Sequence, residues 1–265
     1  MIKWVIRLIV VVYVGMLVGV PVGSVVYRAL KPGFHEFFSQ LGTPSAVHAL
    51  ILTLEVAGLA VTLNTIFGLG VAILLARHRF RGASLVEALI DLPLSLSPVV
   101  IGLALVLCYS TTEGFFGSLL THLGITVLFS FPGIVMASAF VSLPYVVREV
   151  QPVLIELGTD QEQAAETLGA GPFTVFWRIT LPSVRWGLAY GVLLTTARVL
   201  GEFGAVAVVS GNIVDRTQTM TLWVDSAITN FNYAGAYAGA LLLGAISTLV
   251  LAALSISRAK EGRLR

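Results

Sequence analysis

Long stretches without charged side chains alternate with short polar segments along most of the chain. Each stretch is long enough to cross the roughly 30 Å hydrocarbon layer of a bilayer as an α-helix. The pattern therefore predicts an all-α, polytopic membrane protein with a single domain over residues 1–265. Six transmembrane helices are expected, at residues 4–28, 50–76, 88–110, 131–150, 183–208 and 233–257.

Composition supports this class of protein. Hydrophobic residues make up 57% of the chain and charged residues 11%, against about 25% charged residues in soluble domains. So few charges cannot coat a soluble globule of 265 residues. The net charge of +2 comes without a basic block, which excludes nucleic acid as a partner because phosphate backbones bind clustered Lys and Arg.

The distribution of Lys and Arg predicts the orientation. With the N-terminus in the cytoplasm, twelve of the 16 basic residues fall on the cytoplasmic side. Arg28, Lys31 and Arg216 fall on the opposite side, and Arg198 falls within a span. Because short cytoplasmic loops carry an excess of positive charge, we expect a multi-pass membrane protein with both termini in the cytoplasm.

The longest cytoplasmic connection, residues 151–182, contains signals for short helices. Thr159 and Glu162 have the spacing of a capping box, in which each side chain accepts a hydrogen bond from a free amide at a helix start. A helix is therefore expected to begin near Asp160 and to end at Gly169, because glycine adopts the left-handed conformation of a helix end without strain.

Pro172 can open a second short helix, which is expected to end before Pro182. The first helix exposes the small side chains of Ala164 and Ala165. Such a surface suits the cleft of a partner protein. The same pattern also fits an amphipathic loop that lies on the lipid headgroups, and periodicity alone leaves both interpretations open.

The residues of this connection resemble a known signature. Gln163-Ala164-Ala165, then Gly169, then Ile179-Thr180-Leu181-Pro182 are similar to the E-A-A motif of binding-protein-dependent ABC importer permeases. The resemblance implies a coupling helix that docks into a cytoplasmic ATPase. The implied coupling residues are Glu162, Gln163, Ala164, Ala165, Gly169, Ile179, Leu181 and Pro182.

One residue departs from the motif. The leading Glu of the family is Gln163 here, with Glu162 directly before it. A charged contact with the ATPase would accordingly be weakened, or shifted by one residue.

Other segments resemble the sulfate/thiosulfate permease subunits, and the W-type subunit most. They are residues 91–93, 97–100, 143–150, 201–206, 208–213 and 218–222. Molybdate and tungstate permeases share Gly201-Glu202-Phe203-Gly204 but tend to carry a second proline at the position of Ser97. Sulfate is therefore the expected substrate, with molybdate or tungstate as the alternative.

The resemblance implies the type I ABC importer permease (MetI-like) fold, a place in the inner membrane of a bacterium and transport by alternating access. It implies a heterodimer with a sister permease, two copies of an ATPase, and an extracytoplasmic sulfate-binding protein. ATP and Mg are expected on the ATPase and no cofactor on this chain.

Ionisable residues within a span are costly and are candidates for function. Arg198 and Glu202 are four residues apart, so on a helix they share one face and can neutralise each other. The pair fits a structural role at a subunit interface, and it fits a role in the transport pathway equally well.

Two prolines interrupt the third predicted span, at Pro93 and Pro98, and Ser95 and Ser97 lie between them as hydrogen-bond donors. Free backbone groups are tolerated where protein or a water-filled cavity satisfies them. Neutral donors also suit a dianion that must be released again. A kinked packing helix is the alternative. The pathway or gate candidates are Ser95, Ser97, Pro98, Arg198, Glu202 and Ser210.

Signatures of other chemistry are missing from the sequence. The chain has no G-x-x-x-x-G-K-S/T phosphate loop, no metal-ligand spacing and four scattered histidines, His35, His48, His78 and His122. No catalytic or metal-binding residue is expected. An ion-coupled secondary carrier remains an alternative, although carriers often have matching halves and only the second half here has a long cytoplasmic loop.

Overall fold

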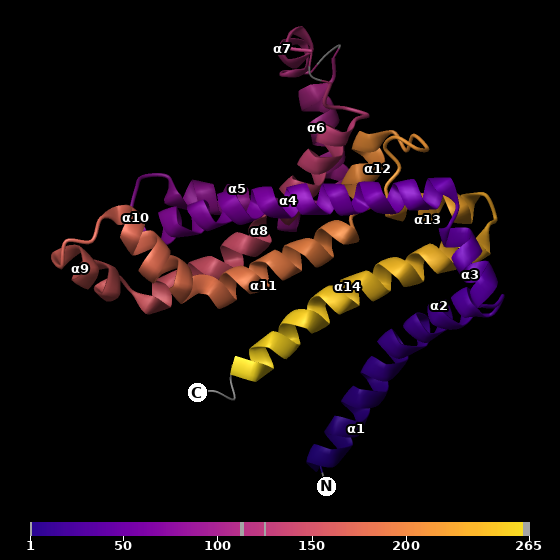
Figure 1. Cartoon of the computed structure of the whole chain (residues 1–265), viewed down its shortest axis with the longest axis horizontal. Coiled ribbons are helices and arrows are strands. Elements are labelled where there is room, and N and C mark those ends of the chain that lie inside the picture. Colours follow the sequence, from indigo (N-terminus) through magenta and orange to yellow (C-terminus); the bar gives the residue numbers. More distant parts are fainter. Residues whose placement is uncertain (1, 112–113, 125, 262–265) are drawn as a thin grey trace.

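The computed structural model describes residues 2–111, 114–124 and 126–261, and every regular element within these residues is a helix (Figure 1). In chain order the helices are α1 (Ile2–Val14), the π-helix η1 (Gly15–Gly19), α2 (Val20–Leu30), α3 (Phe34–Leu41), α4 (Pro44–Arg77), α5 (Ala83–Ser95), α6 (Pro98–Tyr109), α7 (Gly117–His122), α8 (Phe131–Leu157), α9 (Asp160–Thr167), α10 (Pro172–Val175), the π-helix η2 (Phe176–Thr180), α11 (Leu181–Leu200), α12 (Gly204–Ser210), α13 (Met220–Thr229) and α14 (Tyr233–Glu261).

Four unbroken helices in the described part of the chain are long and apolar enough to cross a membrane: Lys3–Leu30, Pro44–Arg77, Phe131–Leu157 and Tyr233–Ala252. Two further helix pairs pass the same test together but are bent at a break. The six predicted spans therefore correspond to four unbroken helices and two broken ones. The unbroken helices extend beyond several predicted bounds: α4 begins at Pro44, and α8 continues to Leu157 through Pro152.

The third predicted span, 88–110, is not one helix. α5 and α6 meet at 116°, and Leu96 and Ser97 between them have extended backbones. Pro98 causes the break, because it has no amide hydrogen and its ring pushes the preceding residue out of the helical conformation. Pro93 lies inside α5 without ending it. The expectation that both prolines interrupt the span is therefore half wrong.

The fifth span also differs from its prediction. Helical structure runs from Pro172 through η2 into α11, so the short helix that Pro172 opens continues past Pro182 instead of ending before it. In η2 the Leu181 amide donates to the carbonyl of Phe176, five residues back, and this wider turn leads the chain into Pro182 at the start of α11. The predicted span 183–208 instead breaks after Leu200, where α11 and α12 meet at 56°.

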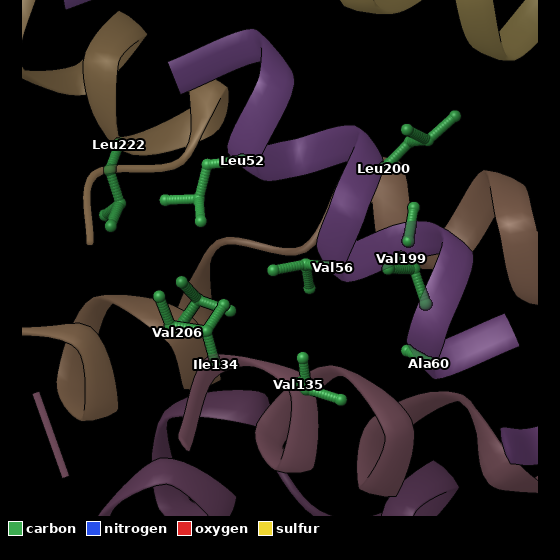
Figure 2. Close-up of a cluster of buried hydrophobic side chains, with 10 residues drawn as sticks. Leu52, Val56, Ala60, Ile134, Val135, Val199, Leu200, Val206 and Leu222 are labelled. Carbon is green, nitrogen blue, oxygen red and sulfur yellow. The ribbon is translucent and has the colours of Figure 1, made fainter. Parts of the chain in front are cut away.

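The core is built around α8, because more than half of the residues in its most apolar 18-residue stretch are buried. Figure 2 shows a cluster of buried side chains from α4, α8, α11, α12 and α13. Glycines bring the helices close together. A Cβ on Gly68 of α4 would lie 2.8 Å from the Val146 Cβ, and one on Gly191 of α11 would lie 2.8 Å from the Val146 Cα. Small residues of this kind allow membrane helices to approach closely.

Short helices lie at the two ends of the fold, and the first helix lies outside the core (Figure 1). α9 and α10 lie at one end of the long axis, and α3 and α13 lie at the other (Figure 1). The helix α1 to α2 diverges from α14 towards the N-terminus (Figure 1). Within the described structure, none of the residues in the most apolar 18-residue stretch of this first helix is buried.

Candidate functional site

The first candidate site is α9, which starts at Asp160 and is followed by Gly169, as the sequence predicts. Gly169 has φ +87°, and the amide of Ala170 donates to the carbonyl of Ala165 at 3.0 Å. This bond closes the helix end over the left-handed glycine. An added Cβ on Gly169 would meet no other atom within 4 Å in the described structure.

The predicted capping box does not form. Thr159 makes no side-chain cap at the start of α9, and its hydroxyl accepts a hydrogen bond from Gln163 Nε2 at 3.0 Å instead. The carboxylate of Glu162 binds Arg77 and Thr180. Arg77 offers the carboxylate an opposite charge, which an amide at the helix start lacks.

The exposed side of α9 carries the small residues that the sequence singled out. Gln163, Ala164 and Gly169 are exposed, and Ala165 is half-buried. Ile179 and Leu181 are half-buried and Pro182 is exposed, at the junction of η2 and α11 rather than on α9.

Three large apolar side chains lie exposed close to α9 along the chain. Leu168 is 88% exposed, Phe173 is 76% exposed and Trp177 is 52% exposed. The Phe173 and Trp177 rings are 6.0 Å apart. We call Leu168, Phe173 and Trp177 the apolar docking patch. Sequence reasoning missed it, although bulky apolar residues in a connection too short to span a membrane were the available signal.

The second candidate site lies where the two broken helices meet. A Cβ on Gly204 would lie 3.0 Å from the Pro98 Cβ and 3.3 Å from the Val99 amide nitrogen, and one on Gly102 would lie 2.9 Å from the Ala205 carbonyl oxygen. The breaks at 96–97 and 201–203 are thus neighbours in space. The sequence predicted an interruption only in the third span, and it gave no sign that this break touches a second one.

Arg198 and Glu202 form the predicted ion pair, with Arg198 Nη1 2.5 Å from Glu202 Oε2. They do not share one helix, because α11 ends at Leu200. Glu202 is buried, its Oε1 accepts a hydrogen bond from the Ala205 amide at 2.8 Å, and its carbonyl accepts one from the Thr221 hydroxyl at 2.8 Å. The carboxylate therefore accepts from an amide in the first turn of α12, and the backbone carbonyl of Glu202 joins the break to α13.

The remaining pathway candidates are in different surroundings. Ser95 and Ser97 are exposed and Pro98 is half-buried. Ser210 is buried at the end of α12. Its hydroxyl accepts from the Asn212 amide at 3.1 Å and its carbonyl accepts from the Thr217 hydroxyl at 2.7 Å. Ser210 thus holds the loop that follows α12. Within the described residues, no three His, Cys, Asp or Glu side chains gather as metal ligands.

Solved structures support the fold. A bacterial ABC transporter that imports the acidic polysaccharide alginate has a chain that matches this one with a TM-score of 0.80, covering 97% of this chain and 95% of that chain. The two chains are 16% identical, so the match supports the architecture alone.

Curated relatives are much closer in sequence. The chain is 47% identical to the sulfate transport system permease protein CysW of Synechococcus elongatus, over 95% of this chain and 87% of that protein. It is 48% identical to the chloroplastic sulfate permease 2 of Chlamydomonas reinhardtii, over 92% and 67%. It is 38% identical to the sulfate transport system permease protein CysT of Escherichia coli, over 95% and 90%.

The model of one protein family matches residues 65–260, a segment that contains both broken helices, α9 and the apolar docking patch. That family is described as the binding-protein-dependent transport system inner membrane component. With the helical architecture and the similarity to permeases over nearly its whole length, the chain belongs to the family of inner membrane components of binding-protein-dependent transport systems.

Proposed function

We propose that this chain is a permease subunit of an ATP-driven sulfate importer, of the W type. The observation that carries the proposal is its 47% identity to a sulfate transport permease over 95% of the chain. Thiosulfate is a proposed second substrate of the same subunit, because sulfate and thiosulfate are both tetrahedral and doubly charged.

In the proposed complex this chain pairs with a sister permease and receives sulfate from an extracytoplasmic binding protein. Two copies of a cytoplasmic ATPase bind ATP and Mg, since this chain has no phosphate loop. Both termini of this chain lie in the cytoplasm, on the side of the ATPases. ATP-driven closure of the ATPases then alternates the access of the pathway.

The exposed small residues of α9 and the apolar docking patch form the proposed contact with the ATPase. Small side chains let the partner approach the α9 backbone, and Phe173 and Trp177 offer the large aromatic surfaces that are common in interface anchors. Glu162 is occupied by Arg77 and Thr180. The docking surface therefore presents the amide of Gln163 where the family has a carboxylate.

The meeting point of the two broken helices is the proposed wall of the pathway. Ser95 and Ser97 are exposed beside the break and can donate hydrogen bonds to an anion. The charge of Arg198 is neutralised by Glu202 at 2.5 Å. A wall with neutral donors and no net positive charge binds a dianion weakly enough to let it pass.

Reconstitution tests this proposal. The two permeases, the ATPase and the binding protein are placed in vesicles, and sulfate uptake is measured with and without ATP. Uptake should require ATP and survive an uncoupler, and thiosulfate should compete with it more strongly than molybdate does. Uptake that an ion gradient drives without ATP would point to a secondary carrier, and stronger competition by molybdate would reassign the substrate.

A further inference from the structure

One carboxylate joins α9 to two other parts of the chain. Glu162 Oε2 lies 2.9 Å from Arg77 Nε. Its other oxygen, Oε1, accepts hydrogen bonds from the Thr180 hydroxyl at 2.7 Å and from Arg77 Nη2 at 3.2 Å. The Arg77 and Glu162 side chains are only 11% and 17% exposed. We call these three residues the Arg77–Glu162–Thr180 node.

The node reaches three membrane helices. Arg77 is the last residue of α4, and its Nη1 donates to the carbonyl of Leu154 in the last turns of α8 at 2.8 Å. Thr180 is buried as the last residue of η2, directly before α11. A single side chain of α9 is thereby bonded to the ends of α4 and η2, and through Arg77 to α8.

The chain on either side of α9 is a weaker mechanical connection. Gly158 precedes the helix with φ +64°, and Gly169 follows it with φ +87°. Gly171 comes directly before α10. Glycine permits more backbone conformations than any other residue. In contrast, the ion pair of the node is held by two charge-assisted contacts in a site with little solvent, where such contacts are strong.

The two sides of α9 thus have different tasks. Gln163 and Ala164 are exposed, whereas Glu162 is turned towards its own chain. A carboxylate that is held by three donors of its own chain is directed away from a partner on the exposed side of α9. Its position suits the transfer of force from α9 to the helices behind it.

We propose that the Arg77–Glu162–Thr180 node is the mechanical link through which a displacement of α9 moves α4, α8 and α11 together. Arg77, Glu162 and Thr180 are positioning residues in this scheme, and none of them touches the transported anion. The inference rests on the proposed function, in which an ATPase docks on α9. It adds the internal path by which that docking reaches the membrane helices.

The test is the coupling ratio, defined as sulfate ions taken up per ATP hydrolysed by the complete transporter in vesicles. Glu162→Gln keeps the shape and an acceptor for Thr180 but removes the charge, and Arg77→Met removes the other half of the ion pair. Each change should lower the coupling ratio about fivefold or more. Co-purification of the ATPase and basal ATP hydrolysis should stay within about twofold of wild type, because the docking surface is unchanged.

Three further variants sharpen the test. The double change Arg77→Met/Glu162→Gln should be no worse than either single change, because both break the same link. Thr180→Val removes only a hydroxyl and should lower the ratio about twofold. Glu156→Gln removes a carboxylate from the exposed last turn of α8 and should leave the ratio unchanged.

A coupling ratio at the wild-type level in assembled Glu162→Gln transporters would overturn the inference. This holds even if the yield of complex fell, because an unchanged ratio with a lower yield describes a purely structural ion pair. If Glu162→Gln transporters do not assemble, Thr180→Val decides, and an unchanged ratio there also overturns it. Failure of the ATPase to bind the wild-type permease is a different result, which would remove the proposed function itself.

Discussion

At the scale of single residues, stability depends on how the buried carboxylate of Glu202 is neutralised. Glu202 is 3% exposed and depends on Arg198 for neutralisation. Breaking a buried ion pair from one side is far more costly than removing both partners, because one change leaves an uncompensated charge.

The ion pair gives the first prediction. Arg198→Met should destabilise the assembled transporter by about 3 kcal/mol, because it strands a buried carboxylate. Glu202→Gln should cost less, since Arg198 is partly exposed and the amide oxygen can still accept from Ala205. The double variant should recover most of the loss, measured as the thermal midpoint of the purified complex. Additive damage would show that the two side chains serve separate networks.

Sulfate uptake by the same double variant separates the two roles considered for the pair. Near-normal uptake identifies a structural pair. Assembled but inactive transporters identify a gate.

Gly169 gives the second prediction. Its φ of +87° costs an L-residue roughly 1–2 kcal/mol, and a β-branched side chain suits it least. Gly169→Val should reorient the end of α9 and reduce ATPase co-purification several-fold. Gly169→Asn should behave nearly as wild type, because Asn tolerates this conformation and the space around the Cβ is open. Equal losses in both variants would mean that side-chain bulk, rather than backbone strain, disturbs docking.

The residue scale also shows where the sequence was informative. The role of Gly169 was predictable because glycine carries its conformational preference wherever it stands. The role of Glu162 was not. Its expected partner was an amide of its own helix, but Arg77 lies 85 residues away in the chain, and local spacing carries no information about that distance.

At the scale of elements, the fold depends on close packing between the halves of the two broken helices. The helices α8 and α14 begin at Phe131 and Tyr233, where the sequence predicts two spans to begin, because proline, glycine and polar residues mark these boundaries. The break at 201–203 was missed. It is held by the contacts of Glu202 with Arg198, Ala205 and Thr221, and it falls in an apolar stretch that reads as one helix.

The contact between α6 and α12 gives the third prediction. A Cβ on Gly102 would lie 2.9 Å from both the Ala205 carbonyl oxygen and the Val208 Cβ. Gly102→Ala should therefore destabilise the complex by about 1–3 kcal/mol and lower transport. Gly70→Ala is the matched control on α4, where an added Cβ meets no atom within 4 Å in the described structure. Equal thermal midpoints for the two variants would contradict the packing of α6 on α12.

At the scale of the whole molecule, the distribution of Lys and Arg predicts the membrane topology. Chemical labelling can measure that topology. α3 lies at one end of the fold and the α9 to α10 region at the other (Figure 1). Ser39→Cys and Ser84→Cys, both at exposed positions, are introduced singly into a Cys108→Ser background. An impermeant maleimide should label the Ser39→Cys variant only from outside and the Ser84→Cys variant only from the cytoplasmic side. Labelling of both variants from one side would contradict the six-span topology.

The exposed first helix has a consequence for how this sequence can change over evolutionary time. Its most apolar window has no buried residue in the described structure, and the match to the family begins only at residue 65. Selection on this segment acts through whatever lies beside it, a lipid or a neighbouring subunit, and hardly through the subunit's own core. Its individual residues are therefore free to drift among apolar types, whereas the buried side of α8, more than half of its most apolar stretch, must keep the shape of its side chains.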